Sequence, residues 1–119
     1  MLYHKNIGFP TSIRVDIYLY SLKYGNHARY ESLRDRYGVI ELPSYIDLRL
    51  VDIIEVETYD NINVDKFVCR MSYNNDCDLT VVFKSDGFVK TVWLNKKTDI
   101  HKTLDRTRYN VPVKKGKII

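Results

Sequence analysis

Two histidines and two arginines are the residues of this 119-residue chain whose side-chain chemistry is most distinctive. Cleavage of RNA without a metal ion needs a base for the 2′-hydroxyl, an acid for the leaving 5′-oxygen, and cations for the charge on the phosphate. Histidine suits the acid and base roles because its pKa lies near neutrality, and arginine donates two parallel N–H groups to phosphate oxygens. The candidate catalytic residues are His27, Arg34, Arg70 and His101.

The spacing of these residues is compatible with one shared cleft. His27 and Arg34 lie seven residues apart on a predicted helix, so their side chains project within about 20° of each other. His101 follows the last predicted strand, and we expect it to return over the open end of the sheet. Hydroxyl, aromatic and cationic side chains would add phosphate contacts and base stacking. This nucleic-acid-binding set is Thr91, Trp93, Thr103, Arg106, Arg108 and Tyr109.

Each of these residues also has a purely structural interpretation. A histidine near a helix start, such as His27, is more often an exposed or cap-adjacent residue, and His101 is equally typical of a solvated loop residue. Arg70 is placed to pair with an acid such as Asp78. Trp93 is more typical of packing than of base stacking. The arginines after residue 105 are typical of a solvated tail.

The signals for other chemistries are weaker. His27 and Glu31 have the i, i+4 spacing of metal ligands, and an Asp-x-His pair ends at His101, but no zinc-type spacing completes either set. Cys69 and Cys77 do not form a Cys-x-x-Cys motif. The chain has neither a phosphate-binding glycine loop nor a Gly-x-Ser-x-Gly motif. We therefore expect no metal and no cofactor.

The charge of the chain is divided sharply along its length. The net charge is +4, from 19 basic and 15 acidic residues. Residues 1–40 carry +3, residues 41–65 carry −6, residues 66–95 carry +1 and residues 96–119 carry +6. Basic segments that converge in space would attract a polyanion such as RNA. The alternative is that they only solubilise the domain and pair with the acidic stretch.

Length and composition predict one domain over residues 1–119, with an irregular arm over 1–12 and a basic, flexible tail over 110–119. Ten tyrosines, four phenylalanines and one tryptophan exclude a disordered chain, and no run of apolar residues is long enough to span a bilayer. The first residues lack a secretion signal, which favours a cytoplasmic location. Cys69 and Cys77 are too few for a disulfide framework, so we expect reduced thiols that are buried or half-buried.

The first half of the chain predicts one strand and one main helix. β-Branched and aromatic residues favour a strand over 15–20. A helix is expected over 27–37, with Asn26 as its N-cap and Gly38 as its stop. Its spacing predicts a stripe of side chains buried against the sheet. The expected stripe is Tyr30, Leu33 and Tyr37.

The second half predicts an antiparallel meander. A short helical turn after residue 47 should lead into a strand from Ile53, and alternating residues over 66–73 predict the next strand. Turns are expected at 74–76 and at Asp86-Gly87, the latter as a two-residue hairpin turn. The predicted cross-strand pairs are Phe67–Phe83, Cys69–Val81, Met71–Leu79, Leu79–Leu94, Val81–Val92, Val82–Thr91 and Thr80–Trp93. The fold class is therefore α+β, with an antiparallel sheet of four or five strands and one main helix packed on one face.

Two segments resemble known families. The sequence LKYGNHA at 22–28, followed by an arginine-bearing helix, resembles the start of small RelE-like toxin domains. The sequence VKTVWLN at 89–95, with DIHKTL at 99–104 and then Tyr109, resembles a segment of small bacteriophage and mobile-element proteins of unassigned function. A helix followed by an antiparallel meander is similar to the barnase/EndoU/colicin/RelE group of metal-independent ribonucleases.

The resemblance and the basic segments together predict a cytoplasmic RNA-binding protein, with metal-independent RNA cleavage of the RelE-like type as its finer form. Histidines would then serve as acid and base, and arginines would stabilise the phosphate. The alternative is a non-enzymatic phage protein that binds a host, defence or antitoxin-like protein through its basic or acidic face. Neither interpretation predicts a membrane partner or specifies an oligomeric state.

Overall fold

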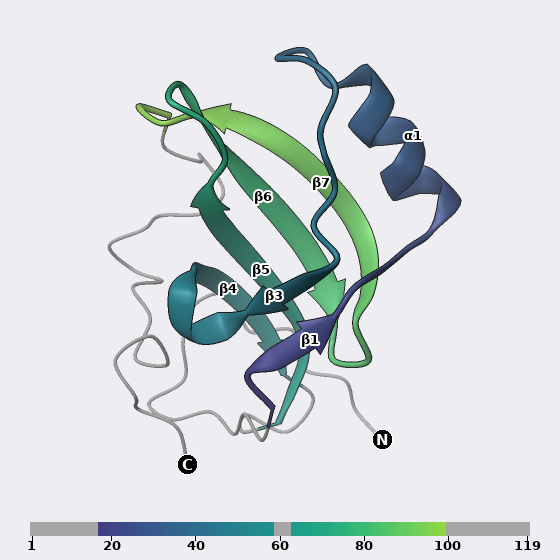
Figure 1. The fold of residues 1–119 in the computed structure, drawn as a ribbon. Coiled ribbons are helices and arrows are strands. Elements are labelled where there is room, and N and C mark those ends of the chain that lie inside the picture. The colour runs from purple at the N-terminus through teal and green to yellow at the C-terminus, as the bar shows by residue number, and fades with distance from the viewer. Residues whose placement is uncertain (1–16, 59–62, 100–119) are drawn as a thin grey trace.

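The computed structural model describes residues 17–58 and 63–99, and it contains one helix and two sheets within these ranges (Figure 1). The expected arm at 1–12 and tail at 110–119 lie outside the described residues. The elements in chain order are β1 (Leu19–Ser21), β2 (Lys23–Tyr24), α1 (Asn26–Arg34), β3 (Tyr45–Asp47), the 3-10 turn η1 (Leu48–Leu50), β4 (Asp52–Thr58), β5 (Val64–Ser72), β6 (Cys77–Lys84) and β7 (Phe88–Lys96).

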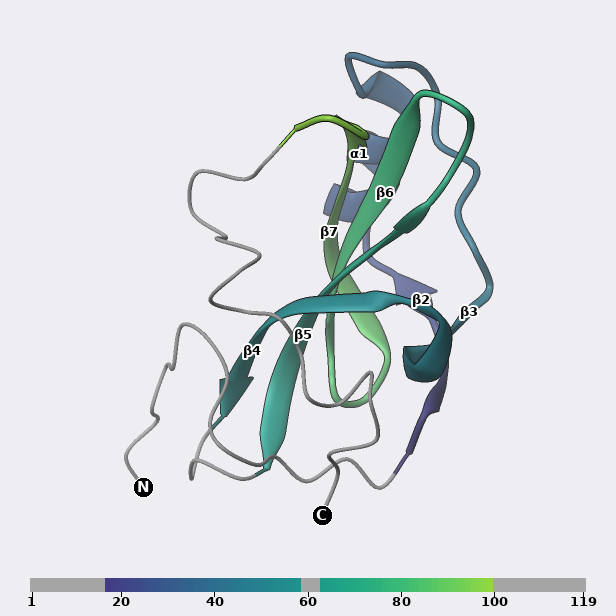
Figure 2. The same cartoon turned by 90° about the vertical axis from the view of Figure 1, so that its left-hand side faces the viewer.

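The main sheet has five strands in the order β2-β7-β6-β5-β4, so β4 to β7 form the predicted antiparallel meander. The α+β fold class is confirmed, and α1 packs beside β7. The short strand β2 extends the sheet by pairing in parallel with the start of β7. Strands β1 and β3 form a separate antiparallel ribbon that lies on one side of the sheet (Figure 2). No helix in the described part of the chain is long and apolar enough to cross a membrane.

The predicted register of both hairpins is confirmed. Phe67 pairs with Phe83 and Met71 with Leu79, and the pairs across β6 and β7 are those expected from the alternation. The turn before β7 differs from the prediction, because Ser85 joins it and the Gly87 N–H donates to the Lys84 carbonyl. A register shift between Val82 and Phe83 compensates for that extra turn residue. Consequently every side chain from Thr91 onward keeps its predicted face.

The core lies between the sheet and the β1–β3 ribbon. The Tyr20 ring of β1 lies 5.6 Å from the Phe67 ring and 5.2 Å from the Phe83 ring, centroid to centroid. Both cysteines are free and buried, as predicted. Burial raises the pKa of the Cys69 thiol far above its usual range, with a smaller contribution from Asp52. The short turn and strand predicted after residue 47 are also confirmed, as η1 and β4.

The predicted buried face of the helix is wrong at two of its three positions. Tyr30 and Leu33 are 58% and 66% exposed, and the helix buries Ala28 and Ser32 instead. Tyr37, which follows the end of the helix, is partly buried and packs against the core. The helix also starts one residue earlier than predicted, with Gly25 at the N-cap position, and ends at Arg34. Small side chains on the inner face let the helix backbone approach β7 closely. The contacts that hold it there are polar, as described next.

Candidate nucleic-acid interface

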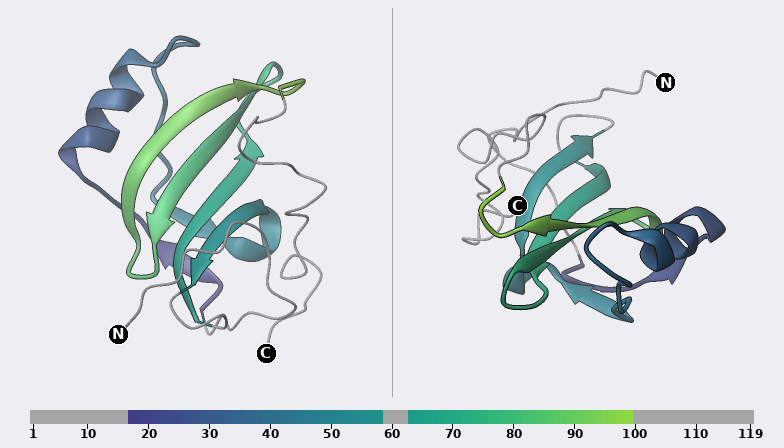
Figure 3. Two further views of the ribbon diagram at one scale, coloured as in Figure 1. Left: turned by 180° about the vertical axis from the view of Figure 1, so that it is seen from behind. Right: turned by 90° about the horizontal axis from the view of Figure 1, so that it is seen from above.

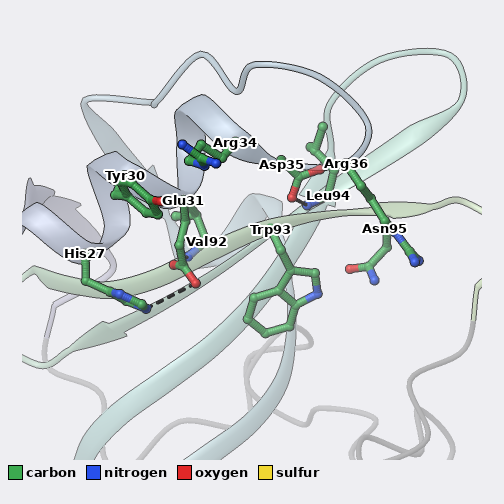
Figure 4. A pocket seen from close by; sticks show the side chains of 10 residues that line it. All are labelled: His27, Tyr30, Glu31, Arg34, Asp35, Arg36, Val92, Trp93, Leu94 and Asn95. Carbon is green, nitrogen blue, oxygen red and sulfur yellow. Dashed lines mark hydrogen bonds and ion pairs between the residues drawn. The ribbon is translucent and has the colours of Figure 1, made fainter.

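A groove of about 760 Å³ lies between α1 and the second half of β7 (Figure 4). The helix forms one wall and the strand forms the floor, and α1 runs beside the edge of the sheet in both views of Figure 3. A volume of this size is typical of ligand-binding clefts, which span about 300–1,000 Å³. The aromatic, cationic and amide side chains that line it are His27, Tyr30, Arg34, Arg36, Trp93 and Asn95.

Carboxylates hold the helix against the edge of β7. A strand at the edge of a sheet leaves every second backbone N–H without a neighbouring strand. Glu31 Oε1 accepts the N–H of Val92 at 3.1 Å, and Asp35 Oδ1 accepts the N–H of Leu94 at 3.1 Å. Asp35 also accepts the N–H of Tyr37, which helps to turn the chain out of the helix. Side chains of α1 therefore take the place that a sixth strand would occupy.

Glu31 also connects two of the predicted site residues. His27 Nε2 lies 3.2 Å from Glu31 Oε2, and the Thr91 hydroxyl donates to Glu31 Oε1. The carboxylate therefore holds one nitrogen of an otherwise exposed imidazole and leaves the other nitrogen, Nδ1, for a substrate. The predicted phosphate contact of Thr91 needs correction, because its hydroxyl positions Glu31.

Two arginines along the helix wall are exposed and held over tyrosine rings. The Arg34 guanidinium lies 5.0 Å from the centroid of the Tyr30 ring, and the Arg36 guanidinium lies 4.7 Å from that of Tyr37. Lys96 approaches the same Tyr37 ring, with Nζ 5.3 Å from its centroid. Stacking on a ring limits the rotation of each cation while leaving its N–H groups exposed at the ring's edge. The groove is thus bordered by cations in restrained positions.

Trp93 provides the large aromatic surface of the groove. It is partly buried, and it packs against a small apolar cluster of Ile54, Val68 and Val82 on the far face of the sheet. In Figure 4 its indole projects to the same side of β7 as the His27 ring. The Thr80 hydroxyl donates to Asn95 Oδ1 at 2.7 Å, which restrains the neighbouring amide. The packing interpretation of Trp93 is confirmed, while its role in base stacking stays a prediction at a residue that lines the groove.

The predicted catalytic role of Arg70 is wrong for this groove. Arg70 is only 1% exposed, and its guanidinium donates to Asp78 Oδ2 at 2.8 Å and to the carbonyl oxygens of Lys96 and Asp99. Its strand position is also two strand spacings, about 10 Å, from Trp93. The arginine therefore joins β5 and β6 to the turn after β7, which corresponds to the structural alternative given above.

The partners of Arg70 form one ion-pair cluster. Lys97 Nζ lies 2.8 Å from Asp78 Oδ1, so the carboxylate receives two cations. Burial raises the pKa of the Asp78 carboxyl, but the hydrogen bonds from Lys97 and Arg70 outweigh burial and leave that pKa below its usual range. The cluster is a structural feature of the face of the sheet that carries Arg70.

The structure brings together three predicted site residues, His27, Arg34 and Trp93, and attaches a fourth, Thr91, through Glu31. Arg70 is elsewhere. The remaining predicted site residues lie outside the described residues, and their placement stays a prediction. These residues are His101, Thr103, Arg106, Arg108 and Tyr109.

Sequence reasoning missed Glu31, Asp35 and Arg36 as groove residues. The available signal was the i, i+4 spacing of Glu31 and Asp35, which puts both carboxylates on one side of the helix. Acids on a short helix are ordinarily solvated, so this spacing alone does not indicate contact with a sheet.

The groove is not assembled like a metal centre. Within residues 17–58 and 63–99, no group of three or more histidine, cysteine, aspartate or glutamate side chains is placed to hold a metal ion. Comparison with protein-family models, with curated proteins and with solved structures gives no match for this chain. The functional argument therefore starts from the geometry of the groove.

Proposed function

We propose that the groove between α1 and β7 binds single-stranded RNA. The observation that carries this proposal is the gathering of one indole, one imidazole and two arginines around a single cleft, on Trp93, His27, Arg34 and Arg36. Bases stack on aromatic rings whatever their sequence, and arginines bind the phosphates between them. An unpaired strand is favoured over a duplex because a stacked base pair cannot lie on the indole.

The electrostatics of the groove support an anionic ligand. Arg34 and Arg36 line it and are exposed. The two carboxylates in the same wall accept backbone N–H groups, and Glu31 also pairs with His27, so part of their negative charge is offset by these donors. The net charge of +4 adds long-range attraction to a polyanion.

The finer part of the proposal is metal-independent cleavage of the bound RNA. His27, oriented by Glu31, would take the proton from a 2′-hydroxyl, whose oxygen then bonds to the adjacent phosphorus. The bond from phosphorus to the 5′-oxygen breaks, and that oxygen takes up a proton from solvent water as it leaves. The products are a 2′,3′-cyclic phosphate and a 5′-hydroxyl. Arg34 would stabilise the charge on the phosphate oxygens.

RNA is favoured over DNA as the ligand because only RNA carries the hydroxyl on which His27 would act. The proposal places the protein in a cytoplasm, and the two free, buried cysteines support a reducing compartment.

The binding proposal is tested through Trp93, which is the only tryptophan of the chain. Titration with poly(U) in EDTA should quench its fluorescence as bases stack on the indole. In anisotropy titrations with a labelled oligouridine, Trp93→Leu should lose about 1–3 kcal/mol of binding free energy per stacked base. Arg34→Ala should weaken binding and reduce the salt slope of log K by about 0.7, the value for one phosphate contact on a single strand.

Arg49→Ala is the matched control, because Arg49 is an exposed arginine that stacks on Tyr18 away from the groove. It should leave oligouridine affinity and its salt slope unchanged. Absence of quenching, or equal losses in Arg34→Ala and Arg49→Ala, would overturn the assignment of the groove.

Cleavage is tested separately by incubating RNA and its 2′-deoxy analogue with the protein in EDTA. Wild type should cut only RNA, and His27→Ala should slow the reaction by about 10²–10⁴-fold, the usual contribution of one acid–base group. Equal rates in wild type and His27→Ala would remove His27 from catalysis while leaving the binding proposal standing.

A further inference from the structure

The outward face of α1 carries apolar side chains. Tyr30 and Leu33 are three residues apart, so they lie on one side of the helix, and they are 58% and 66% exposed. An ordinary surface helix turns such side chains toward the core and its acids toward solvent, and α1 does the reverse.

Arginines flank this apolar face. Arg29 and Arg34 lie on either side of Tyr30 and Leu33 in helical projection, and both are exposed. The Arg29 Nε donates to the Tyr24 carbonyl at 3.1 Å, which restrains its guanidinium near the start of the helix. The acids of this segment, Glu31 and Asp35, point toward β7 and bond to its backbone. The outward face is therefore apolar at its centre and cationic at its margins.

From this arrangement we propose that the outward face of α1, defined by Arg29, Tyr30, Leu33 and Arg34, docks on a partner helix whose apolar stripe is bordered by carboxylates. Tyr30 and Leu33 have the i, i+3 spacing of a row of side chains that packs against a second helix. Carboxylates beside the partner's stripe complement the arginines and speed association. This face adjoins the cleft proposed for RNA and shares Tyr30 and Arg34 with it, whereas Leu33 and Arg29 do not line that cleft, so variants at these two residues test the docking face alone.

Charge and chemistry select this occupant. A second copy of the chain packing through the same helix would bring the arginines of both copies together, and like charges there are repulsive. RNA gains little from Leu33, because an aliphatic side chain offers no ring for a base to stack on. An acidic, partly apolar protein surface satisfies both parts of the face.

The test uses labelled synthetic helical peptides and the full-length chain. The first peptide has leucine at every third or fourth position with glutamates on both flanks, the second has the same composition in scrambled order, and the third has lysine in place of glutamate. In anisotropy titrations only the first should bind, and more weakly as salt rises. Leu33→Ala should weaken it about tenfold, as expected for an anchor residue. Arg29→Ala should weaken it and flatten its salt dependence.

Matched variants separate this surface from the RNA cleft. Leu50→Ala, at a leucine that is 81% exposed in η1, should leave peptide affinity unchanged. Trp93→Leu should lose oligouridine affinity but keep peptide affinity, whereas Leu33→Ala should do the opposite. This double dissociation shows whether one proposal fails while the other stands.

Three results would overturn the proposal. The first is no binding of the acidic helical peptide, or equal binding of its scrambled form. The second is a concentration-dependent dimer in sedimentation that Leu33→Ala abolishes, which would make a second copy the occupant. The third is loss of oligouridine affinity in Leu33→Ala, which would assign the outward face to RNA.

Discussion

Replacement of Arg70 tests whether this side chain is a structural tie of the sheet. Its three nitrogens donate to Asp78 Oδ2 at 2.8 Å, to the Asp99 carbonyl at 3.0 Å and to the Lys96 carbonyl at 2.9 Å. Removing one partner of a buried ion pair generally costs about 3–5 kcal/mol of unfolding free energy. We expect Arg70→Ala to have an effect within that range.

The remaining contacts place the expected loss at the lower end of the range. Asp78 keeps its bond from Lys97 Nζ at 2.8 Å, and the Lys96 carbonyl keeps the Asp99 N–H at 2.9 Å. We therefore expect Arg70→Ala to lower the free energy of unfolding by about 3 kcal/mol. At about 4 °C for each kcal/mol in a domain of this size, the melting temperature should fall by about 12 °C.

Urea unfolding followed by Trp93 fluorescence and by circular dichroism measures this loss. Arg49→Ala is the matched control, since Arg49 makes a two-bond ion pair with Asp47 but is exposed, and its urea midpoint should stay close to that of wild type. Arg70→Met retains most of the side-chain volume but cannot pair with Asp78, so it should lower the free energy of unfolding nearly as much as Arg70→Ala. Wild-type stability in Arg70→Met, or equal effects of Arg70→Ala and Arg49→Ala, would refute the reasoning.

Three further predictions concern titration and the attachment of the helix. The pKa of Asp78 is lowered in the folded protein, so the stability that this carboxylate contributes is present above its unfolded pKa of about 4 and is lost as pH falls through the folded pKa. In a plot of the urea midpoint against pH, Asp78→Asn should therefore show a smaller decrease at acid pH than wild type. Burial raises the pKa of Tyr24, whose hydroxyl donates to the Pro43 carbonyl, to about 12. The stabilising effect of the protonated Tyr24 hydroxyl is full below pH 10 and is lost as pH rises through 12. When wild type and Tyr24→Phe are both titrated and followed by ultraviolet absorbance, the difference between them should be one tyrosine that ionises near pH 12. Glu31→Ala should cost about 1–3 kcal/mol and speed hydrogen exchange at the Val92 amide, while Glu31→Gln, which keeps an acceptor oxygen, should be milder; unchanged exchange in Glu31→Ala would contradict the attachment.

Hydrophobic alternation was enough to predict the meander. A slip of one residue in β5 would have set Met71 against Asp78 and turned the whole buried face outward, so burial alone selected the register that the structure confirms. The same argument predicted the pairs of β6 with β7, even though the turn between them has one more residue than expected. The pairing of two strands follows from the alternation along each strand, and a wrong register would cost much free energy because it would expose the whole buried face.

The orientation of the helix did not follow from its pattern. Helical periodicity assumes that apolar residues face the core, which predicted a buried Tyr30 and Leu33. In the folded chain the edge amides of β7 need acceptors, and Glu31 and Asp35 supply them, so the helix turns its acids inward and its apolar residues outward. That need does not exist until the sheet has formed.

Alternation along short segments was enough to predict β4 to β7, their register and the burial of both cysteines. It did not predict the short strands β2 and β3, whose partners lie far away in the chain, and it placed the first strand at 15–20, whereas β1 covers Leu19–Ser21. The fold also settles that Arg70 is sequestered among Asp78 and two carbonyl groups, while Arg34 borders the groove with Trp93. The physical reason is that an arginine's role depends on which acceptors and how much solvent surround it. Those surroundings are supplied by residues distant in the chain.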